Sequence, residues 1–413
     1  MTLALLLPNM ALYISFSFLY WLHFIPSSST PTLPTHAVWS DSLYFINKKA
    51  NVLQNIDNCR NYDIFLRKLE GFDIGKHSFI NIVHIGDSHI QADFFTAEVR
   101  SRLQQIYGNA GRGFFFPCGL ANSNTPHNIH LSYTGTWNSC KTTQQSENCS
   151  TGLSGYVATT TDERASIKIT INNINKNNHS IKIIKVYCDT RANNQFSIAL
   201  LAAGIIYNPT IQHDEYWGFE LPTSVQTFEL FWKKQNTFQT EFSLLGISLE
   251  SKQKGLFYHS VGQNGATFAS VSRNASFSTH LQSLYPDIVI VSLGTNDAAT
   301  KILNLAKIEE SILLLLNKIR SVAPEAVIVL TTPNDTYYQQ QSNTNIPKMV
   351  SIIKNIAYEQ GCLVWDFYEV MGGRASIVEW QMYQLADKDR IHLSPKGYRL
   401  QGELFYEALQ DIF

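Results

Sequence analysis

The sequence predicts an α/β domain with a parallel sheet, into which an antiparallel β-sandwich is inserted. In residues 76–117 and again in residues 255–413, short apolar runs alternate with segments of helical periodicity. This alternation indicates βαβ units. In residues 118–254, apolar and polar residues alternate one by one along short runs, separated by clusters of Asn, Gly, Thr and Pro. That pattern indicates half-buried antiparallel strands.

Five apolar runs predict the strands of the parallel sheet: residues 81–87, 256–262, 287–294, 326–333 and 362–368. Strands that are covered by helices on both faces have such continuous apolar runs. Helices are predicted between them, most clearly at residues 301–320 and 345–360. A five-stranded parallel sheet between two layers of helices is a flavodoxin-like three-layer fold.

Five further runs predict the strands of the insert: residues 166–173, 180–189, 195–204, 224–234 and 241–250. No segment between them sustains a helix over three turns. We therefore expect an antiparallel sandwich of the jelly-roll type, inserted between the first and second parallel strands. Insertions in loops at this edge of a sheet often carry binding functions.

The first 30 residues predict export. Residues 3–25 are almost wholly apolar and contain no Lys, Arg, Asp or Glu, and a Ser- and Pro-rich linker follows. Such a run serves either as the core of a signal peptide or as a membrane anchor. A basic n-region and an A-x-A site are missing, so both readings stay open. We expect a periplasmic or secreted protein, with residues 1–30 as signal or inner-membrane anchor and residues 31–75 as linker and N-terminal extension.

The composition excludes several classes of protein. The chain has 32 Lys+Arg and 33 Asp+Glu, so it lacks the basic excess that nucleic-acid binding by bulk charge requires. Hydrophobic residues make up 44% and charged residues 16%, which excludes a disordered chain and a coiled coil. Six Cys do not imply a disulfide scaffold, and whether Cys140 pairs with Cys149 stays open. No Cys/His spacing is typical of a zinc site, and we expect neither metal nor cofactor.

Polar residues that can carry chemistry follow three predicted strands and recur near the C-terminus. Open α/β sheets place their sites at the carboxyl ends of their strands. The four blocks are Gly86-Asp87-Ser88-His89, Gly262-Gln263-Asn264-Gly265-Ala266-Thr267, Gly294-Thr295-Asn296-Asp297 and Asp389-Arg390-Ile391-His392-Leu393-Ser394.

Each block also has a structural interpretation. Ser88 alone is more readily a helix N-cap, and Asn296 a residue of a strand-ending turn. Gly265 alone would supply an unusual backbone angle, and His392 would be a surface turn residue. Four such coincidences at one edge are improbable together, so a shared site is favoured. His89, which follows Ser88, is expected to be structural, as is His84.

These residue types suit acyl transfer. A Ser hydroxyl needs a base, and His392 can take its proton near neutral pH. Asp389, three residues earlier, can accept from the other imidazole nitrogen. Negative charge develops on the carbonyl oxygen in the transition state, where each preorganised donor contributes roughly 3 kcal/mol. The candidate donors are the backbone N–H groups of Ser88 and Gly265 and the side-chain amide of Asn296.

The four blocks resemble those of the SGNH (GDSL) hydrolases, in which Ser, Gly, Asn and His each supply one catalytic part. The resemblance implies that Ser88 is the nucleophile of a triad with Asp389 and His392. It implies an oxyanion hole formed by Ser88, Gly265 and Asn296.

A second resemblance narrows the substrate. The segment HIGDSHIQADFFTAEVRSRLQQIYGNAGRG, followed by a long β insert, is similar to periplasmic peptidoglycan O-acetylesterases of the Ape type. It implies a discontinuous catalytic domain, residues 76–117 and 255–413. It also implies a carbohydrate-binding-module-like β domain at residues 118–254.

The resemblance implies a serine esterase that removes O-acetyl groups from peptidoglycan at muramoyl O-6. Two related functions stay open: an O-acetyltransferase with the same triad, and an esterase of another acetylated polysaccharide. A wall-binding protein with an inert catalytic domain is disfavoured by the complete set of blocks. The expected partner is an acetylated glycan, with no nucleic acid, a membrane tether left open and a monomeric chain.

Overall fold

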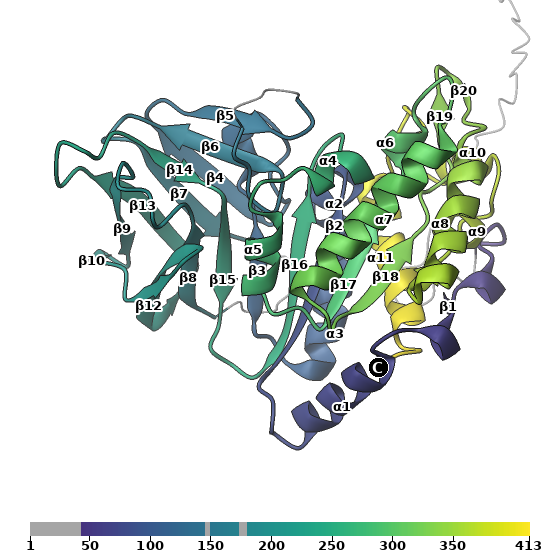
Figure 1. Cartoon of the computed structure of the whole chain (residues 1–413), viewed down its shortest axis with the longest axis horizontal. Coiled ribbons are helices and arrows are strands. Elements are labelled where there is room, and N and C mark those ends of the chain that lie inside the picture. Colours follow the sequence, from purple (N-terminus) through teal and green to yellow (C-terminus); the bar gives the residue numbers. More distant parts are fainter. Residues whose placement is uncertain (1–42, 145–148, 173–179) are drawn as a thin grey trace, which may run out of the picture. The chain divides into compact units, whose positions relative to one another are not determined.

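Six strands form the central sheet of the computed structural model, which describes residues 43–144, 149–172 and 180–413 (Figure 1). Their order is β1 (Leu53–Gln54), β21 (Leu363–Trp365), β18 (Val327–Thr331), β17 (Ile288–Ser292), β2 (Phe79–Gly86) and β16 (Gly255–Gly262). All are parallel except β1, which runs antiparallel to β21. In chain order the five parallel strands are arranged 2-1-3-4-5, as in flavodoxin-like sheets.

The prediction of a five-stranded sheet is therefore incomplete, because β1 adds a sixth strand. Two residues are too few to show either alternation or an apolar run. Leu53 pairs with Trp365 and Gln54 with Val364, so β1 is formed by its contact with the sheet edge.

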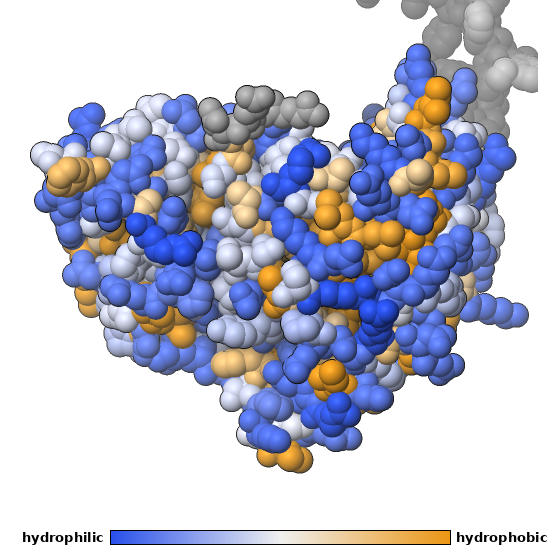
Figure 2. All heavy atoms as spheres, in the orientation of Figure 1, coloured by the Kyte–Doolittle hydropathy of each residue, from blue (hydrophilic) through white to orange (hydrophobic). Residues whose placement is uncertain are grey.

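Helices cover both faces of this sheet. One face carries α4 (Phe268–Ser272), α5 (Phe277–Ser283), α7 (Leu305–Val322) and α8 (Ile346–Gln360), which share a core with alternate residues of β2, β17 and β18. The other face carries α3 (Phe94–Tyr107) and α11 (Pro395–Leu409), whose Phe95 and Phe405 pack on His84 and Trp365. Hydrophobic residues gather along the seam between α7 and α8 in Figure 2.

The remaining helices are short or peripheral: α1 (Tyr62–Asp73), α2 (Ser88–Gln91), α6 (Thr295–Ala298), α9 (Phe367–Val370) and α10 (Ser376–Met382). Single turns of 3₁₀-helix and a small hairpin complete this part: η2 (Lys48–Ala50), η3 (Ile56–Asn58), η4 (Cys118–Ala121), β19 (Tyr337–Tyr338) and β20 (Gln341–Ser342). The predicted helix at residues 301–320 begins later, at Leu305, because the Asn304 side chain accepts from Lys307 N–H and caps α7 there.

The insert contains two five-stranded antiparallel sheets that enclose a common core. One contains β10 (Ile205–Tyr207), β9 (Ser197–Ala202), β13 (Thr227–Lys233), β7 (Ser166–Ile171) and β4 (Ile129–Thr134). The other contains β11 (Ile211–His213), β12 (Tyr216–Val225), β8 (Ile181–Tyr187), β15 (Gly246–Glu250) and β3 (Gly111–Phe115). A smaller sheet contains β14 (Phe242–Leu244), β6 (Tyr156–Thr160) and β5 (Asn138–Lys141). The jelly-roll connectivity stays a prediction.

The insert shares a hydrophobic core with the α/β layers. Phe114 of β3 and Tyr187 of β8 belong to the same buried cluster as Phe277 and Leu281 of α5. The strand β3 pairs with β15 although it precedes residue 118, so the sandwich sheet takes in residues of the predicted catalytic segment. The domain limits at residues 118 and 254 stay a prediction.

Within the described residues, no helix has both the length and the apolar character that crossing a membrane would require. The predicted signal or anchor at residues 1–30 lies outside the described residues, so it is not tested.

A buried hydrogen-bond chain crosses four strands of the central sheet. His84 of β2 contacts the Tyr258 hydroxyl of β16 through Nδ1 at 2.7 Å and Ser292 Oγ of β17 through Nε2 at 2.6 Å. Thr331 of β18 donates to the same Ser292 oxygen at 2.8 Å. Burial lowers the pKa of His84 to about 3, so the ring is neutral. His84 lies across the sheet in a structural role, as expected.

Replacing His84 with Leu should destabilise the protein by about 2 to 4 kcal/mol, because the buried Tyr258 hydroxyl would lose its partner and Ser292 Oγ would keep only its bond to Thr331. Urea unfolding followed by circular dichroism measures this change. His130→Leu, at an exposed position of β4, is the control and should have little effect. A His84→Leu protein as stable as this control would contradict the structural role.

Candidate active site

Ser88 lies at the carboxyl edge of the central sheet, directly after β2. The strand ends at Gly86, where a Cβ would lie 2.8 Å from the Ser292 carbonyl oxygen, so the close approach requires glycine. Asp87 caps the next helix by accepting from His89 N–H at 3.0 Å. Ser88 is then the first residue of α2 and is partly buried.

Ser88, His392 and Asp389 form a continuous hydrogen-bonded chain. Ser88 Oγ lies 3.0 Å from His392 Nε2, and His392 Nδ1 lies 2.7 Å from Asp389 Oδ2. The other carboxylate oxygen of Asp389 accepts from the backbone N–H groups of Ile391 at 2.8 Å and His392 at 3.0 Å. Partial burial raises the pKa of Asp389, but these hydrogen bonds outweigh it and hold the pKa below its ordinary value. The carboxylate therefore stays ionised and orients the imidazole.

Gly265 lies in the loop between β16 and α4, with φ of +79°. A Cβ at this position would meet only the Thr143 methyl group at 3.9 Å, so backbone conformation and not space favours glycine. Among the residues that the structure describes, the backbone N–H groups of Gly265 and Ser88 have no hydrogen-bond partner. Both can therefore donate to a bound group.

Asn296 lies in α6, beside both of these segments. Its side-chain nitrogen donates to Ala266 O at 2.9 Å and to Asp87 Oδ2 at 3.2 Å. It thus contacts the neighbour of Gly265 and the neighbour of Ser88. Both of its N–H groups are engaged within the protein.

Two features near the site did not follow from the sequence. His89 is buried, contacts the Tyr398 hydroxyl at 2.8 Å, and its ring centroid lies 5.3 Å from that of His392. Burial lowers the pKa of His89 to about 3, so a neutral ring lies beside His392. The second feature is Asp297, in which burial raises the pKa to about 7. Only its place after Asn296 in the third block singled it out.

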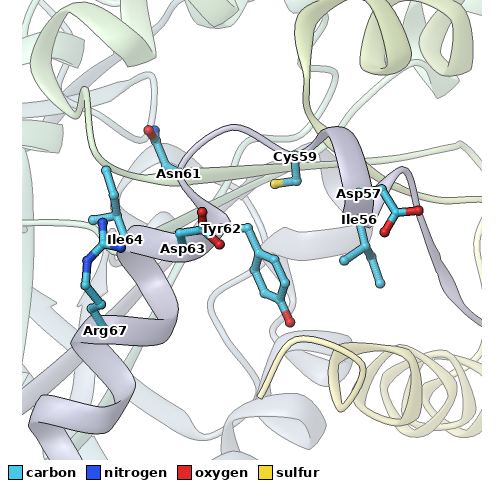
Figure 3. A pocket seen from close by; sticks show the side chains of 8 residues that line it. All are labelled: Ile56, Asp57, Cys59, Asn61, Tyr62, Asp63, Ile64 and Arg67. Carbon is cyan, nitrogen blue, oxygen red and sulfur yellow. The ribbon is translucent and has the colours of Figure 1, made fainter.

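The pocket in Figure 3 lies elsewhere. It has a volume of about 430 Å³ and is lined by Ile56, Asp57, Cys59, Asn61, Tyr62, Asp63, Ile64 and Arg67. It includes none of the predicted site residues.

Comparison with known proteins connects this geometry to a family. Residues 239–400 match the GDSL-like Lipase/Acylhydrolase family. This stretch contains Gly265, Asn296, Asp389 and His392 but not Ser88, which the insert separates from it. No curated protein sequence matches the chain.

Solved structures are similar at low sequence identity. A peptidoglycan O-acetylesterase is 21% identical, with a TM-score of 0.70 over 89% of this chain and 97% of that chain. An acetylxylan esterase from Geobacillus stearothermophilus is 22% identical over 38% of this chain and 73% of that chain, with a TM-score of 0.31. A family two carbohydrate esterase from Clostridium thermocellum is 10% identical over 69% of this chain and 98% of that chain, with a TM-score of 0.32. The first of these establishes the shared fold.

The state of Asp297 predicts a pH dependence of stability. Its pKa of about 7 lies above its ordinary value near 4, so between these values the folded chain holds a proton that the unfolded chain has lost. Protonated Asp297 therefore makes its full contribution to stability below about pH 4, and this contribution is lost as the pH rises to 7. Asp297→Asn keeps an acceptor for Phe268 N–H and removes the titration. The melting temperature of the variant minus that of the original protein should rise from pH 5 to pH 8.

Asp73→Asn, at the exposed end of α1, is the control for this measurement. A difference for Asp297→Asn that is constant across the pH range, as expected for the control, would contradict the prediction.

The match of residues 239–400 and the shared fold confirm the predicted resemblance to the GDSL/SGNH acylhydrolases, and both support a carboxylic ester hydrolase.

Proposed function

We propose that the protein is a serine esterase that removes O-acetyl groups from cell-wall peptidoglycan, at muramoyl O-6. The observation that carries the proposal is the chain from Ser88 through His392 to Asp389, together with the backbone N–H groups of Ser88 and Gly265, which have no partner among the described residues. A nucleophile, a base, an orienting carboxylate and anion donors are the parts that acyl transfer needs.

In the proposed acylation step, His392 Nε2 takes the proton of Ser88 Oγ while that oxygen bonds to the acetyl carbon. Asp389 accepts from Nδ1–H, so the lone pair of Nε2 faces Ser88. The C–O bond to the sugar then breaks, and the leaving oxygen takes the proton from His392. Ser88 is left acetylated.

Deacylation repeats these roles with water. His392 takes a proton from the water as the water oxygen bonds to the acetyl carbon. Acetate then leaves as the bond between the acetyl carbon and Ser88 Oγ breaks. Ser88 Oγ regains its proton from His392. No group is consumed besides ester and water.

The oxyanion of both steps is proposed to lie against the N–H groups of Ser88 and Gly265. Asn296 would be a third donor. Of its two hydrogen bonds, the one to Asp87 is the longer, at 3.2 Å, so we propose that this N–H turns toward the oxyanion as charge develops.

Two observations support the proposed substrate and compartment. The similar structure of highest TM-score given above is that of a peptidoglycan O-acetylesterase, and it spans the insert as well as the catalytic layers. Cys140 and Cys149 form a disulfide, with Cα atoms 6.0 Å apart. A disulfide is typical of an oxidising compartment, where cell-wall glycan is also found. These observations favour an extracytoplasmic enzyme.

Ser88→Ala should lower ester hydrolysis by at least about 10³-fold while the fold is retained, because the nucleophile is lost and no buried contact is. Acetate release from O-acetylated peptidoglycan measures it. Ser321→Ala, at an exposed position of α7, is the matched control. A Ser88→Ala enzyme that keeps most of its activity would remove Ser88 as nucleophile. Acetyl groups that move to an added glycan, with no acetate released, would indicate a transferase.

Asn296→Ala should lower kcat by about 10² to 10³ and leave KM nearly unchanged, because its donor acts on charge that is present only in the transition state. Steady-state kinetics on the same substrate separate the two constants. A change confined to KM would show that Asn296 binds the substrate instead.

A further inference from the structure

The backbone of residues 263–266 is held almost completely by hydrogen bonds. Gly265 is the exception, with an N–H group that has no partner among the described residues. The other three N–H groups each donate: that of Gln263 to Gly86 O at 3.1 Å, that of Asn264 to Gln91 Oε1 at 2.6 Å, and that of Ala266 to Gln263 O at 3.0 Å. The direction of the Gly265 N–H is therefore set by the bonds on either side of it.

Gln91 uses both ends of its amide to connect this loop to the insert. Its oxygen accepts from Asn264 N–H at 2.6 Å and from the Tyr156 hydroxyl at 3.1 Å. Its nitrogen donates to Ser123 Oγ at 2.8 Å and to Asn124 O at 2.9 Å. Gln91 is 5% exposed and lies at the end of the helix that begins with Ser88. It is therefore fixed in one orientation.

Tyr156 reaches the same loop from the insert. It is the first residue of β6, is fully buried, and its ring stacks on Phe116 at 5.1 Å. Its hydroxyl also lies 3.3 Å from Asn264 N. Burial raises the pKa of Tyr156 to about 12, so the hydroxyl keeps its proton and donates to Gln91.

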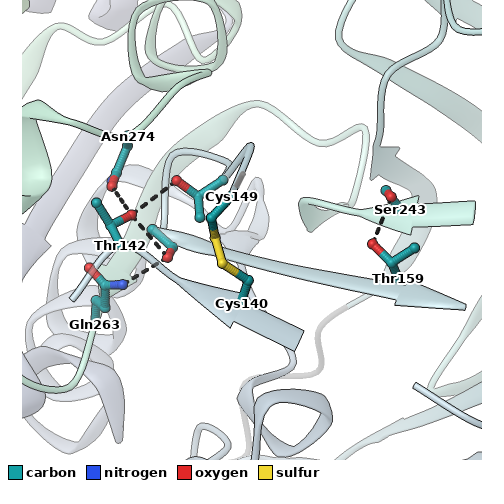
Figure 4. Close-up of a disulfide and its surroundings, with 9 residues drawn as sticks. Cys140, Thr142, Cys149, Thr159, Ser243, Gln263 and Asn274 are labelled. Atoms are coloured by element: carbon teal, nitrogen blue, oxygen red, sulfur yellow. Dashed lines mark hydrogen bonds between the residues drawn. A yellow bond between two sulfur atoms is a disulfide. The ribbon is translucent and has the colours of Figure 1, made fainter. Parts of the chain in front are cut away.

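A second contact between insert and loop lies next to Tyr156. Gln263 Nε2 donates to Gly155 O at 2.7 Å, and Thr142 N–H donates to the same oxygen at 3.0 Å. Thr142 also donates to Asn274 Oδ1 at 2.5 Å, as Figure 4 shows beside the disulfide. The insert is thus hydrogen-bonded to the loop at two consecutive residues, Gln263 and Asn264.

We propose that Gln91 and Tyr156 are positioning residues, which hold Asn264 so that the neighbouring Gly265 N–H faces the oxyanion. This inference rests on the proposed function, in which Gly265 is an oxyanion donor. The inserted β domain then takes part in the chemical step through Tyr156, in addition to any contact with glycan. Neither residue touches the reacting atoms. Their effect is on the geometry of a donor that must lie within hydrogen-bond range of the transition state.

Two substitutions remove these contacts with little change in volume. Tyr156→Phe keeps the ring on Phe116 and removes the hydroxyl. Gln91→Met removes the acceptor of Asn264 N–H and both donors. The matched controls are Tyr187→Phe, a fully buried insert tyrosine bonded to Ser283 Oγ at 3.2 Å, and Gln104→Met, a buried glutamine bonded to Gly111 O and Leu256 O. In the part of the chain that the structure describes, neither control residue is hydrogen-bonded to residues 263–266.

The measurements are kcat and KM with O-acetylated peptidoglycan and with p-nitrophenyl acetate, and the inhibition constant of ethylboronic acid. A boronic acid adds to the nucleophilic Ser oxygen as a tetrahedral anion, so its affinity reports the oxyanion donors. We expect kcat to fall about 10-fold in Tyr156→Phe and about 10²-fold in Gln91→Met, as part of the effect of a complete donor. The boronate should bind more weakly by a similar factor on both variants, and KM should change less than twofold.

Thermal unfolding of all four variants separates positioning from stability. The proposal is overturned if the two test variants lose no more kcat than their controls. It is also overturned if kcat falls while boronate affinity is unchanged. An active Ser88→Ala enzyme would instead overturn the proposed function itself, whatever the result for Tyr156 and Gln91.

Discussion

Polar groups buried at the carboxyl edge of β2 must find partners inside the protein, and the arrangement of the site depends on this requirement. Asp87 is almost fully buried and accepts from both His89 N–H and the Asn296 amide. The side-chain oxygen of Gln91 accepts two hydrogen bonds, and its side-chain nitrogen donates two. Against this background, the backbone N–H groups of Ser88 and Gly265 differ, because neither has a hydrogen-bond partner among the described residues. Donors left free in this way can bind an anion.

The same requirement joins the insert to the catalytic layers. Arg112 of β3 is fully buried and donates to Asp93 Oδ2 at 3.0 Å, at the start of α3. Phe114, two residues later, packs in the core that contains Phe277 of α5. A buried ion pair is strongly destabilising to break, since it leaves an uncompensated charge. Because β3 pairs with β15 of the sandwich sheet, these contacts connect that sheet to the α/β layers.

The sequence predicted the parts of the fold that have a local pattern. The five parallel strands appear as continuous apolar runs because both of their faces are covered, and α8 (Ile346–Gln360) follows its helical periodicity closely. Strands such as β1 and β5 were missed because they are too short to show a pattern, and β1 is paired with β21, which is distant in the chain. The strand β3, which lies in the predicted catalytic segment 76–117, shows the same limit. Its Gly-rich run gives no sign that it pairs with β15, more than a hundred residues later.

The residues of the candidate site were likewise predicted only where the sequence has a local pattern. Ser88, Asn296 and His392 were predicted because each lies in a short block at the end of an element, and the fold brings these ends to one edge. The contact of Gln91 with Tyr156 joins residues 65 positions apart, and neither residue belongs to the four blocks. Hydrogen bonds between buried side chains that are distant in the chain leave no periodicity in the sequence, so only the structure could show them.

Deletion of the insert cannot separate the two roles proposed for it, glycan binding and the positioning of the loop at residues 263–266. A module that only bound glycan could be removed with little effect on small esters, because such esters make no remote contacts. Here removal of residues 118–254 would uncover Phe114, leave Asn264 without the Tyr156 hydroxyl and take away the partner of Gln263. The folded state and the loop that holds Gly265 would then both change, whatever the effect on glycan binding. Substitutions that remove single atoms, such as the hydroxyl of Tyr156, isolate the chemical contribution because the shared core remains in place.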